Sequence, residues 1–158
     1  MRTVSRWPAL RAALLGAALV PVATALAPVS NAYPLAGNYN AYVDGRYDFH
    51  TWIWAFASCQ PPGPINECLY VSANPSPIAR AYAWYAKAQL ANGTYTLTVD
   101  MPEGLRCGNV YYGPVIPTRD VYTFDAVTLS GKLESSFDAG CDGAPGGTIT
   151  YPLTLSRL

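Results

Sequence analysis

The chain lacks most of the residues and spacings that mark a catalytic site. It contains a single histidine, His50, and only 13% of its 158 residues are charged. No Gly-x-Ser-x-Gly segment is present, so the nucleophile elbow of the α/β-hydrolases is excluded. No two cysteines are separated by two residues, which argues against the common zinc-binding motifs. We therefore expect a protein that is not an enzyme and that needs no cofactor.

An excess of positive charge is also missing. Ten basic residues balance ten acidic ones, but three of the arginines lie in the first eleven residues and no acidic residue precedes Asp44. If that N-terminal segment is removed, seven basic residues face ten acidic ones. A protein that binds nucleic acid needs a basic patch, so we expect no nucleic-acid partner. With 51% hydrophobic residues, the chain is too apolar to be disordered.

Residues 1–32 have the three parts of a secretory signal peptide: early arginines, an apolar run, and a small-x-small triplet that ends at Ala32. Cleavage there leaves residues 33–158 as a single domain. A membrane anchor is the alternative, but a spanning helix needs about 20 apolar residues, and the run Ala12–Ala27 is shorter and contains Pro21. We expect secretion to the cell envelope or the medium, with no membrane span in the processed protein.

All the cysteines follow this leader: Cys59, Cys68, Cys107 and Cys141. An even number of cysteines in an exported chain predicts disulfides. The favoured pairing joins Cys59 to Cys68 across a Pro- and Gly-rich turn, which leaves Cys107 for Cys141. In the loop-entropy model these bonds contribute roughly 2.7 and 3.8 kcal/mol. A zinc site is the alternative, but the chain offers one imidazole to complete it, so we expect no metal.

The strongest local signal is the Asn92-Gly93 pair between two segments, 85–91 and 94–100. A two-residue Asn-Gly turn predicts a type I′ β-hairpin. Its register places apolar pairs on one face and polar pairs on the other, as a half-buried ladder requires. The predicted pairs are Ala91 with Thr94, Leu90 with Tyr95, Gln89 with Thr96, Ala88 with Leu97, Lys87 with Thr98 and Ala86 with Val99.

A helix over Ile78–Asn92 is the competing interpretation, with Ser76 as N-cap and Gly93 beyond its end. It leaves the cross-strand agreement unexplained, so we favour strands. Further strands are predicted at Tyr39–Tyr47, Phe49–Ala57, Cys68–Ala73, Cys107–Tyr112, Val121–Leu129, Leu133–Asp138 and Ile149–Ser156. About eight short strands with turns between them indicate an all-β fold, an antiparallel β-barrel or a β-sandwich.

Aromatic side chains are the most informative feature for function. Trp52, Trp54 and Phe56 share one face of a predicted strand, and the other face of that strand is also apolar. Such a strand is buried on both sides, or it meets a core on one side and a ligand on the other. The candidate ligand-binding residues are Trp52, Trp54, Phe56, Tyr82 and Trp84. Core packing of the same residues is the alternative.

The chain resembles small exported proteins of mycobacteria and related actinobacteria. The resemblance rests on the Arg- and Ala-rich leader, on Trp52-x-Trp54-x-Phe56-x-x-Cys59 with Cys68 following, and on Cys107-Gly108-Asn109. It covers the whole chain and implies secretion. It implies no catalytic residue and no particular substrate.

These observations favour a secreted, disulfide-stabilised β domain that binds a cell-envelope component, a small apolar ligand or a host protein without catalysis. A second hypothesis is an envelope glycan hydrolase with His50 nearby, which needs two carboxylates at a suitable separation. Its candidate pairs are Asp44 with Asp48 and Asp120 with Asp125. A third hypothesis is a structural or antigenic exported protein with no dedicated ligand.

Overall fold

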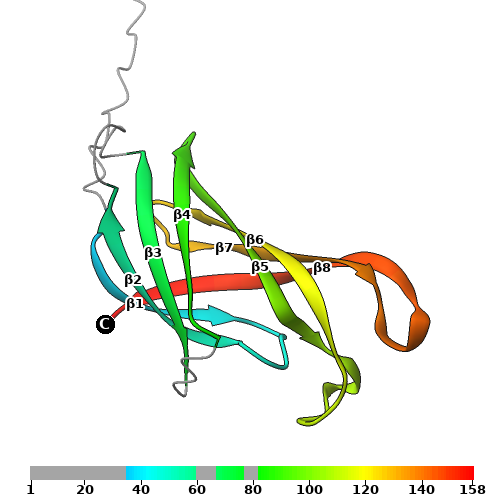
Figure 1. The fold of residues 1–158 in the computed structure, drawn as a ribbon. Helices are drawn as coiled ribbons and strands as arrows, with labels where there is room; N and C mark the ends of the chain where they lie inside the picture. The colour runs from blue at the N-terminus through cyan, green and yellow to red at the C-terminus, as the bar shows by residue number, and fades with distance from the viewer. Residues whose placement is uncertain (1–34, 60–66, 77–81) are drawn as a thin grey trace, which may run out of the picture. The chain divides into compact units, whose positions relative to one another are not determined.

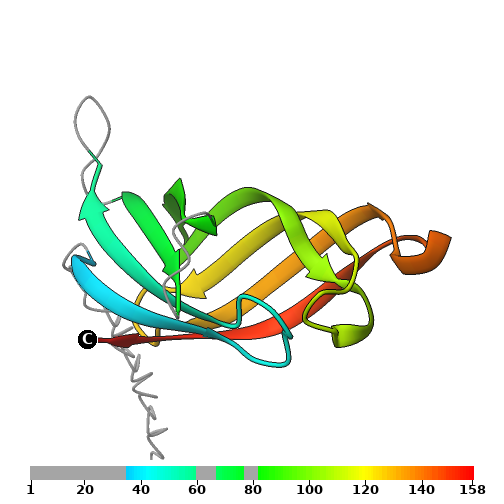
Figure 2. The same ribbon diagram turned by 60° about the horizontal axis from the view of Figure 1, so that its bottom comes forward.

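The computed structural model describes residues 35–59, 67–76 and 82–158. The predicted signal peptide and the turn between Cys59 and Cys68 lie outside these residues. Eight antiparallel strands follow one another around a closed barrel (Figures 1 and 2). The strands are β1 (Gly37–Val43), β2 (Thr51–Ser58), β3 (Cys68–Pro75), β4 (Trp84–Ala91), β5 (Thr94–Arg106), β6 (Val115–Asp125), β7 (Ser130–Ala139) and β8 (Pro145–Arg157).

The prediction of an all-β fold with about eight strands is confirmed, and the architecture is the barrel rather than the sandwich. Each strand pairs with the next along the chain, and β8 returns to β1 with a register from Tyr39–Arg157 to Val43–Leu153. Closure leaves the sheet without a first and a last strand, which are the edges that open sheets must protect. Pro152, which cannot donate a hydrogen bond, lies where the β1 ladder has ended.

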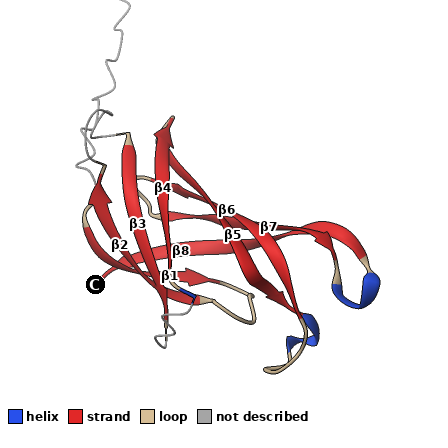
Figure 3. Cartoon of the chain, viewed as in Figure 1, coloured by secondary structure: helices blue, strands red, loops and turns tan. Residues whose placement is uncertain are grey.

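Both predicted disulfides are present, with Cα–Cα distances of 5.5 Å for Cys59–Cys68 and 5.6 Å for Cys107–Cys141. The first joins the end of β2 to the start of β3. The second joins two short helical turns, η2 (Cys107–Asn109) and η3 (Cys141–Gly143). Figure 3 shows that these turns follow the long strands β5 and β7. The disulfide therefore ties two loops that are far apart in the sequence.

The predicted hairpin is confirmed near its turn. The pairs Ala91–Thr94, Leu90–Tyr95 and Gln89–Thr96 form as expected, and β4 excludes a helix over its residues. The ladder ends there, so the three remaining predicted pairs are wrong. Beyond Gln89, β4 stays paired with β3 as far as Trp84, while β5 follows β6, and the two strands separate from their common turn (Figure 1).

Other predicted strands are wrong in whole or in part. Tyr39–Tyr47 ends at Val43, because a turn with Gly45 at a φ of 79° follows. Phe49–Ala57 begins at Thr51, because Phe49 takes a φ of 54°. Cys107–Tyr112 is a turn and a loop, because Gly108 and Asn109 take positive φ values of 68° and 51°, which end an extended strand. The predicted strand Val121–Leu129 stops at Asp125. There the Asp125 carboxylate accepts hydrogen bonds from the backbone N–H groups of Val127 and Thr128, at 2.9 and 2.7 Å. These hydrogen bonds close a turn.

Aromatic rings fill the interior of the barrel. Trp54 lies 5.5 Å from Trp84, 5.2 Å from Tyr122 and 6.2 Å from Phe124 between ring centroids. Aliphatic side chains of the same inward-facing alternation complete this core: Val43, Leu69, Val71, Leu97, Leu133 and Leu153. An eight-stranded barrel has an interior that side chains can just fill, and here large rings fill it.

Candidate ligand-binding site

The structure places most of the predicted ligand-binding residues in the core. Trp52 and Trp54 are 0% exposed, Phe56 is 4% exposed and Trp84 is 7% exposed. The outward face of β2 is apolar and only partly covered, which is why its sequence is apolar on both faces. Tyr82 is half-buried and lines an open hollow at one end of the barrel. In this hollow, several aromatic side chains are open to solvent around one concave surface.

This mouth hollow has a volume of about 550 Å³. It lies where β1 passes to β2, β3 ends, β4 begins and β5 passes to β6, so loops from one end of the barrel meet there. The mouths of β-barrels are common ligand sites. Its aromatic lining is Tyr47, Phe49, Tyr82, Tyr111 and Tyr112, and its charged or titratable lining is Asp48, His50, Glu103 and Arg106.

Phe49 connects the mouth hollow to the core. Its ring centroid lies 4.9 Å from that of Tyr82 and 5.6 Å from that of Trp52. The indole Nε1 of Trp52 donates a hydrogen bond of 2.6 Å to the carbonyl of Phe49. Phe49 has a φ of 54°, a conformation that is uncommon and strained for a bulky residue. The surrounding contacts therefore hold this ring as the inner wall of the hollow.

The outer wall carries the exposed tyrosines. Tyr111 and Tyr112 are 68% and 91% exposed, and their rings meet edge to face at 4.7 Å. The loop that presents them is held at several points. Cys107 N donates to Pro114 O and Gly113 N to Val110 O, each at 2.8 Å, and the disulfide anchors the start of the loop. The two rings are thus displayed on a fixed loop.

Asp48, Glu103 and Arg106, the charged residues of the mouth hollow, each have a side-chain partner. Arg106 forms an ion pair with Asp48 through its Nε atom and donates from Nη1 to the carbonyl of Gly113 at 3.1 Å. The Tyr82 hydroxyl donates to Glu103 at 3.0 Å. The hydrogen bond to Asp48 raises the pKa of Arg106, and the hydrogen bond to Glu103 raises the pKa of Tyr82. The lining of the hollow thus combines two acidic side chains with one guanidinium.

A buried polar network that the sequence did not reveal lies in the barrel next to the mouth. Arg46 donates to Asp120 at 2.9 Å and also to the carbonyl of Gly104. Thr118 and Ser135 each donate to the other Asp120 oxygen at 2.7 Å. Arg46 is 5% exposed and Asp120 is 0% exposed. Each charge is thus compensated by a partner, which is the condition for burying it.

Three polar atoms of the aromatic core have no hydrogen-bond partner among the described residues: Trp54 Nε1, Trp84 Nε1 and Tyr122 Oη. Their rings are mutual neighbours. Burial raises the pKa of Tyr122 well above its usual range, and the nearby Asp120 charge adds to this, whereas Arg46 opposes it. The aromatic rings of the core therefore contact one another while three of their polar atoms lack a hydrogen-bond partner, which is uncommon for buried polar groups.

The carboxylates predicted for a hydrolase are dispersed. Asp48 lines the mouth hollow in its ion pair with Arg106. Asp120 is enclosed in the polar network. Asp125 belongs to the turn after β6, where Ala126 N donates to Gly93 O in the Asn92-Gly93 turn at the opposite end of the barrel. Asp44 hydrogen-bonds the Tyr42 hydroxyl at 3.5 Å on the surface. Neither predicted pair is placed together in the mouth hollow.

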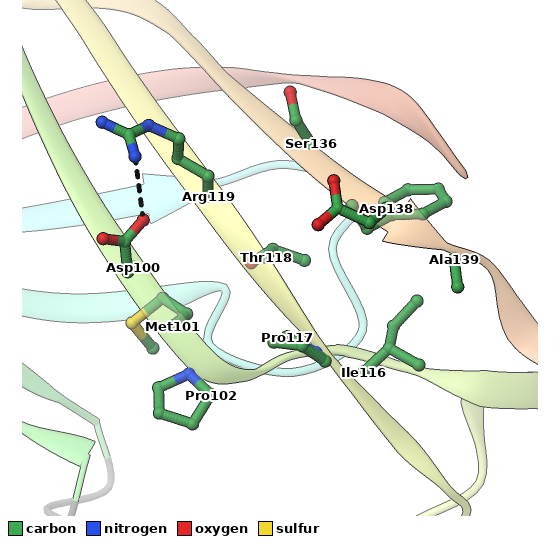
Figure 4. A pocket seen from close by; sticks show the side chains of 11 residues that line it. Asp100, Met101, Pro102, Ile116, Pro117, Thr118, Arg119, Ser136, Asp138 and Ala139 are labelled. Carbon is green, nitrogen blue, oxygen red and sulfur yellow. Dashed lines mark ion pairs between the residues drawn. The ribbon is translucent and has the colours of Figure 1, made fainter.

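A second hollow of about 800 Å³ lies over β5, β6 and β7 (Figure 4). Its charged lining includes Asp100 and Arg119, which are joined by an ion pair of 3.5 Å. Their side chains are 78% and 66% exposed, so water solvates both charges. Its apolar lining consists of Met101, Pro102, Ile116, Pro117, Phe137 and Ala139. Phe137 is the one aromatic ring of this lining and is half-buried, whereas the mouth hollow has five aromatic rings, three of them exposed.

No family model, no curated protein and no solved structure matches this chain. Within residues 35–59, 67–76 and 82–158, no three histidine, cysteine or acidic side chains gather as a metal site. Across the same ranges there is no helix with the length and hydropathy to cross a membrane. The function is therefore argued from the geometry of the mouth hollow.

The buried network gives a direct test of how the barrel is stabilised. Replacing Asp120 with Asn leaves the Arg46 charge uncompensated in the interior, so we expect the free energy of unfolding to fall by about 3–5 kcal/mol. The matched control is Asp100→Asn, which removes a carboxylate from an exposed ion pair, where we expect a change below about 1 kcal/mol. Urea unfolding followed by circular dichroism measures both. Equal effects would contradict the structural role of the network.

Tyr122 gives a test by pH. Because its folded-state pKa is raised, folding disfavours its ionised form, and stability should be complete below about pH 10 and decline as the pH rises further. Tyr122→Phe removes both this ionisation and an unpartnered hydroxyl, so this variant should retain more of its stability at pH 11 than the parent chain. Tyr85→Phe, at a site 76% exposed, is the control and should behave as the parent. The test is the melting temperature of the parent chain and of both variants between pH 7 and pH 11. Equal losses in the parent chain and in Tyr122→Phe would contradict the prediction.

Proposed function

We propose that this protein is a secreted, non-catalytic binding domain that holds a cell-envelope component in the mouth hollow. The two disulfides are compatible with an extracellular or otherwise oxidising compartment. The leader-like segment supports the same location. The enclosed tryptophans are out of reach of a partner, whereas the mouth hollow gathers exposed aromatic rings around a concave site.

The observation that carries the proposal is the pair Tyr111 and Tyr112. Large aromatic rings that face water on a fixed loop are typical of recognition surfaces, because they offer a large contact area at a low cost in conformational entropy. The loop is held by a disulfide and by the bond from Arg106 to Gly113. Binding would therefore require little reordering of this wall of the site.

The chemistry of the hollow favours binding over catalysis. Asp48 is neutralised by Arg106 and Glu103 accepts the Tyr82 hydroxyl, so both carboxylates already have partners. The Nδ1 atom of His50 lies 3.0 Å from the carbonyl of Tyr47, a contact that fixes the orientation of the ring. Among the described residues, His50 forms a hydrogen bond with neither Asp48 nor Glu103. These residues orient one another and form a polar lining.

The proposal is tested by sedimentation of the full exported chain with isolated cell envelopes of the organism that produces it. Tyr112→Ala removes the most exposed ring of the hollow, and we expect its affinity to fall by at least about tenfold, as at a binding hot spot. Tyr85→Ala is the control, because Tyr85 is 76% exposed on β4 and does not line the hollow. It should bind as the parent chain. Equal binding by all three proteins would contradict the proposed site.

A further inference from the structure

We infer that the mouth hollow takes a neutral carbohydrate chain, a ligand of linked sugar rings that carry hydroxyl or acetamido groups and no charge. The inference rests on the proposed function and names its ligand class. Three features of the hollow support it: flat aromatic walls, carboxylates and a guanidinium with unused hydrogen-bonding atoms, and a negative balance of charge.

The aromatic walls match the apolar faces of sugar rings. A pyranose presents a flat face of C–H groups, and such groups carry partial positive charge that the negative face of an aromatic ring attracts. Tyr47, Tyr111 and Tyr112 are 41%, 68% and 91% exposed, so their rings remain available to a ligand. They come from two separate loops, which offers more than one stacking position to a chain of sugars.

The polar lining matches hydroxyl groups. Asp48 and Glu103 each use one carboxylate oxygen in the contacts described above, Oδ2 and Oε2, and each has a second oxygen that can accept a hydrogen bond. Arg106 uses Nε and Nη1, and its Nη2 atom can donate. Neighbouring sugar hydroxyls both donate and accept, so they can bond to a carboxylate and to a guanidinium at once.

The charge of the hollow selects against anionic ligands. Two carboxylates against one guanidinium give a net negative lining, which repels phosphate and uronic acid groups. A cationic ligand would gain from Glu103 and from the tyrosine faces, so a cationic sugar chain is the competitor that the test has to include. A neutral ligand is not repelled by the lining. Within the Asp48–Arg106 ion pair, Arg106 can donate a hydrogen bond to a sugar hydroxyl and Asp48 can accept one.

The test is binding of the full exported chain to a printed panel of hexasaccharides. The neutral probes are hexamers of glucose, mannose, galactose and N-acetylglucosamine, the anionic probe is a glucuronic acid hexamer, and the cationic probe is a glucosamine hexamer. We expect at least one neutral hexamer to bind at least about tenfold more tightly than both charged probes. Tyr112→Ala should weaken that binding at least about tenfold, and Tyr85→Ala should leave it unchanged.

A second variant tests the charge argument. Glu103→Gln keeps a hydrogen-bond acceptor and removes the excess negative charge, so we expect it to bind the glucuronic acid hexamer about tenfold more tightly than the parent chain does. Glu134→Gln is the matched control, because Glu134 pairs with Lys132 on the surface away from the hollow. It should leave the panel unchanged.

The outcomes separate this inference from the proposed function. Preference for a charged probe would overturn the inference that the ligand is a neutral carbohydrate and leave the binding site in place. Envelope binding that depends on Tyr112, without binding to any neutral hexamer, would have the same consequence. Neutral-hexamer binding that Tyr112→Ala does not weaken would overturn both. Failure to bind envelopes and every probe would also overturn both.

Discussion

The pairing of β1 with β8 is the constraint on which the rest of this structure depends. It closes the sheet and encloses a space whose width is set by the strand number. That space is occupied by Trp54, Trp84 and Tyr122, which contact one another. Because the interior is full, a ligand of any size has to bind at an end of the barrel or on its outer surface. The aromatic core therefore leaves the loops and the outer surface of the barrel as the places where a ligand could bind.

The loop between β1 and β2 couples stability to the site. Arg46 reaches into the barrel and binds Asp120, 74 positions later in the chain. The next residues, Tyr47, Asp48 and Phe49, line the mouth hollow. Burial of Arg46 therefore fixes the start of the segment that supplies one wall, and the Asp48–Arg106 ion pair joins this wall to the end of β5. The buried Arg46–Asp120 network and one wall of the mouth hollow thus both depend on the loop between β1 and β2.

Local patterns predicted the fold well because they act over short distances. Asn92-Gly93 defined a hairpin, and the even number of cysteines in a chain predicted to be exported indicated the two disulfides. The site was predicted less well. Tyr82 was identified, but Tyr47, Glu103 and Tyr112 are brought together by barrel closure, which no sequence spacing encodes. The two apolar faces of β2 left open which face was inside, and this placed Trp52 among the ligand-binding candidates.

The claim that the barrel has a packed interior and binds at its mouth is tested most directly by hydrogen exchange of the indole N–H groups, followed by NMR of the disulfide-bonded protein. The account predicts slow exchange for Trp52, Trp54 and Trp84, because all are 7% exposed or less, with the same rates when cell envelopes or a bound hexasaccharide are present. Exchange of Trp54 and Trp84 at the rate of a free indole, or protection that appears only with ligand, would contradict it and indicate an open interior site.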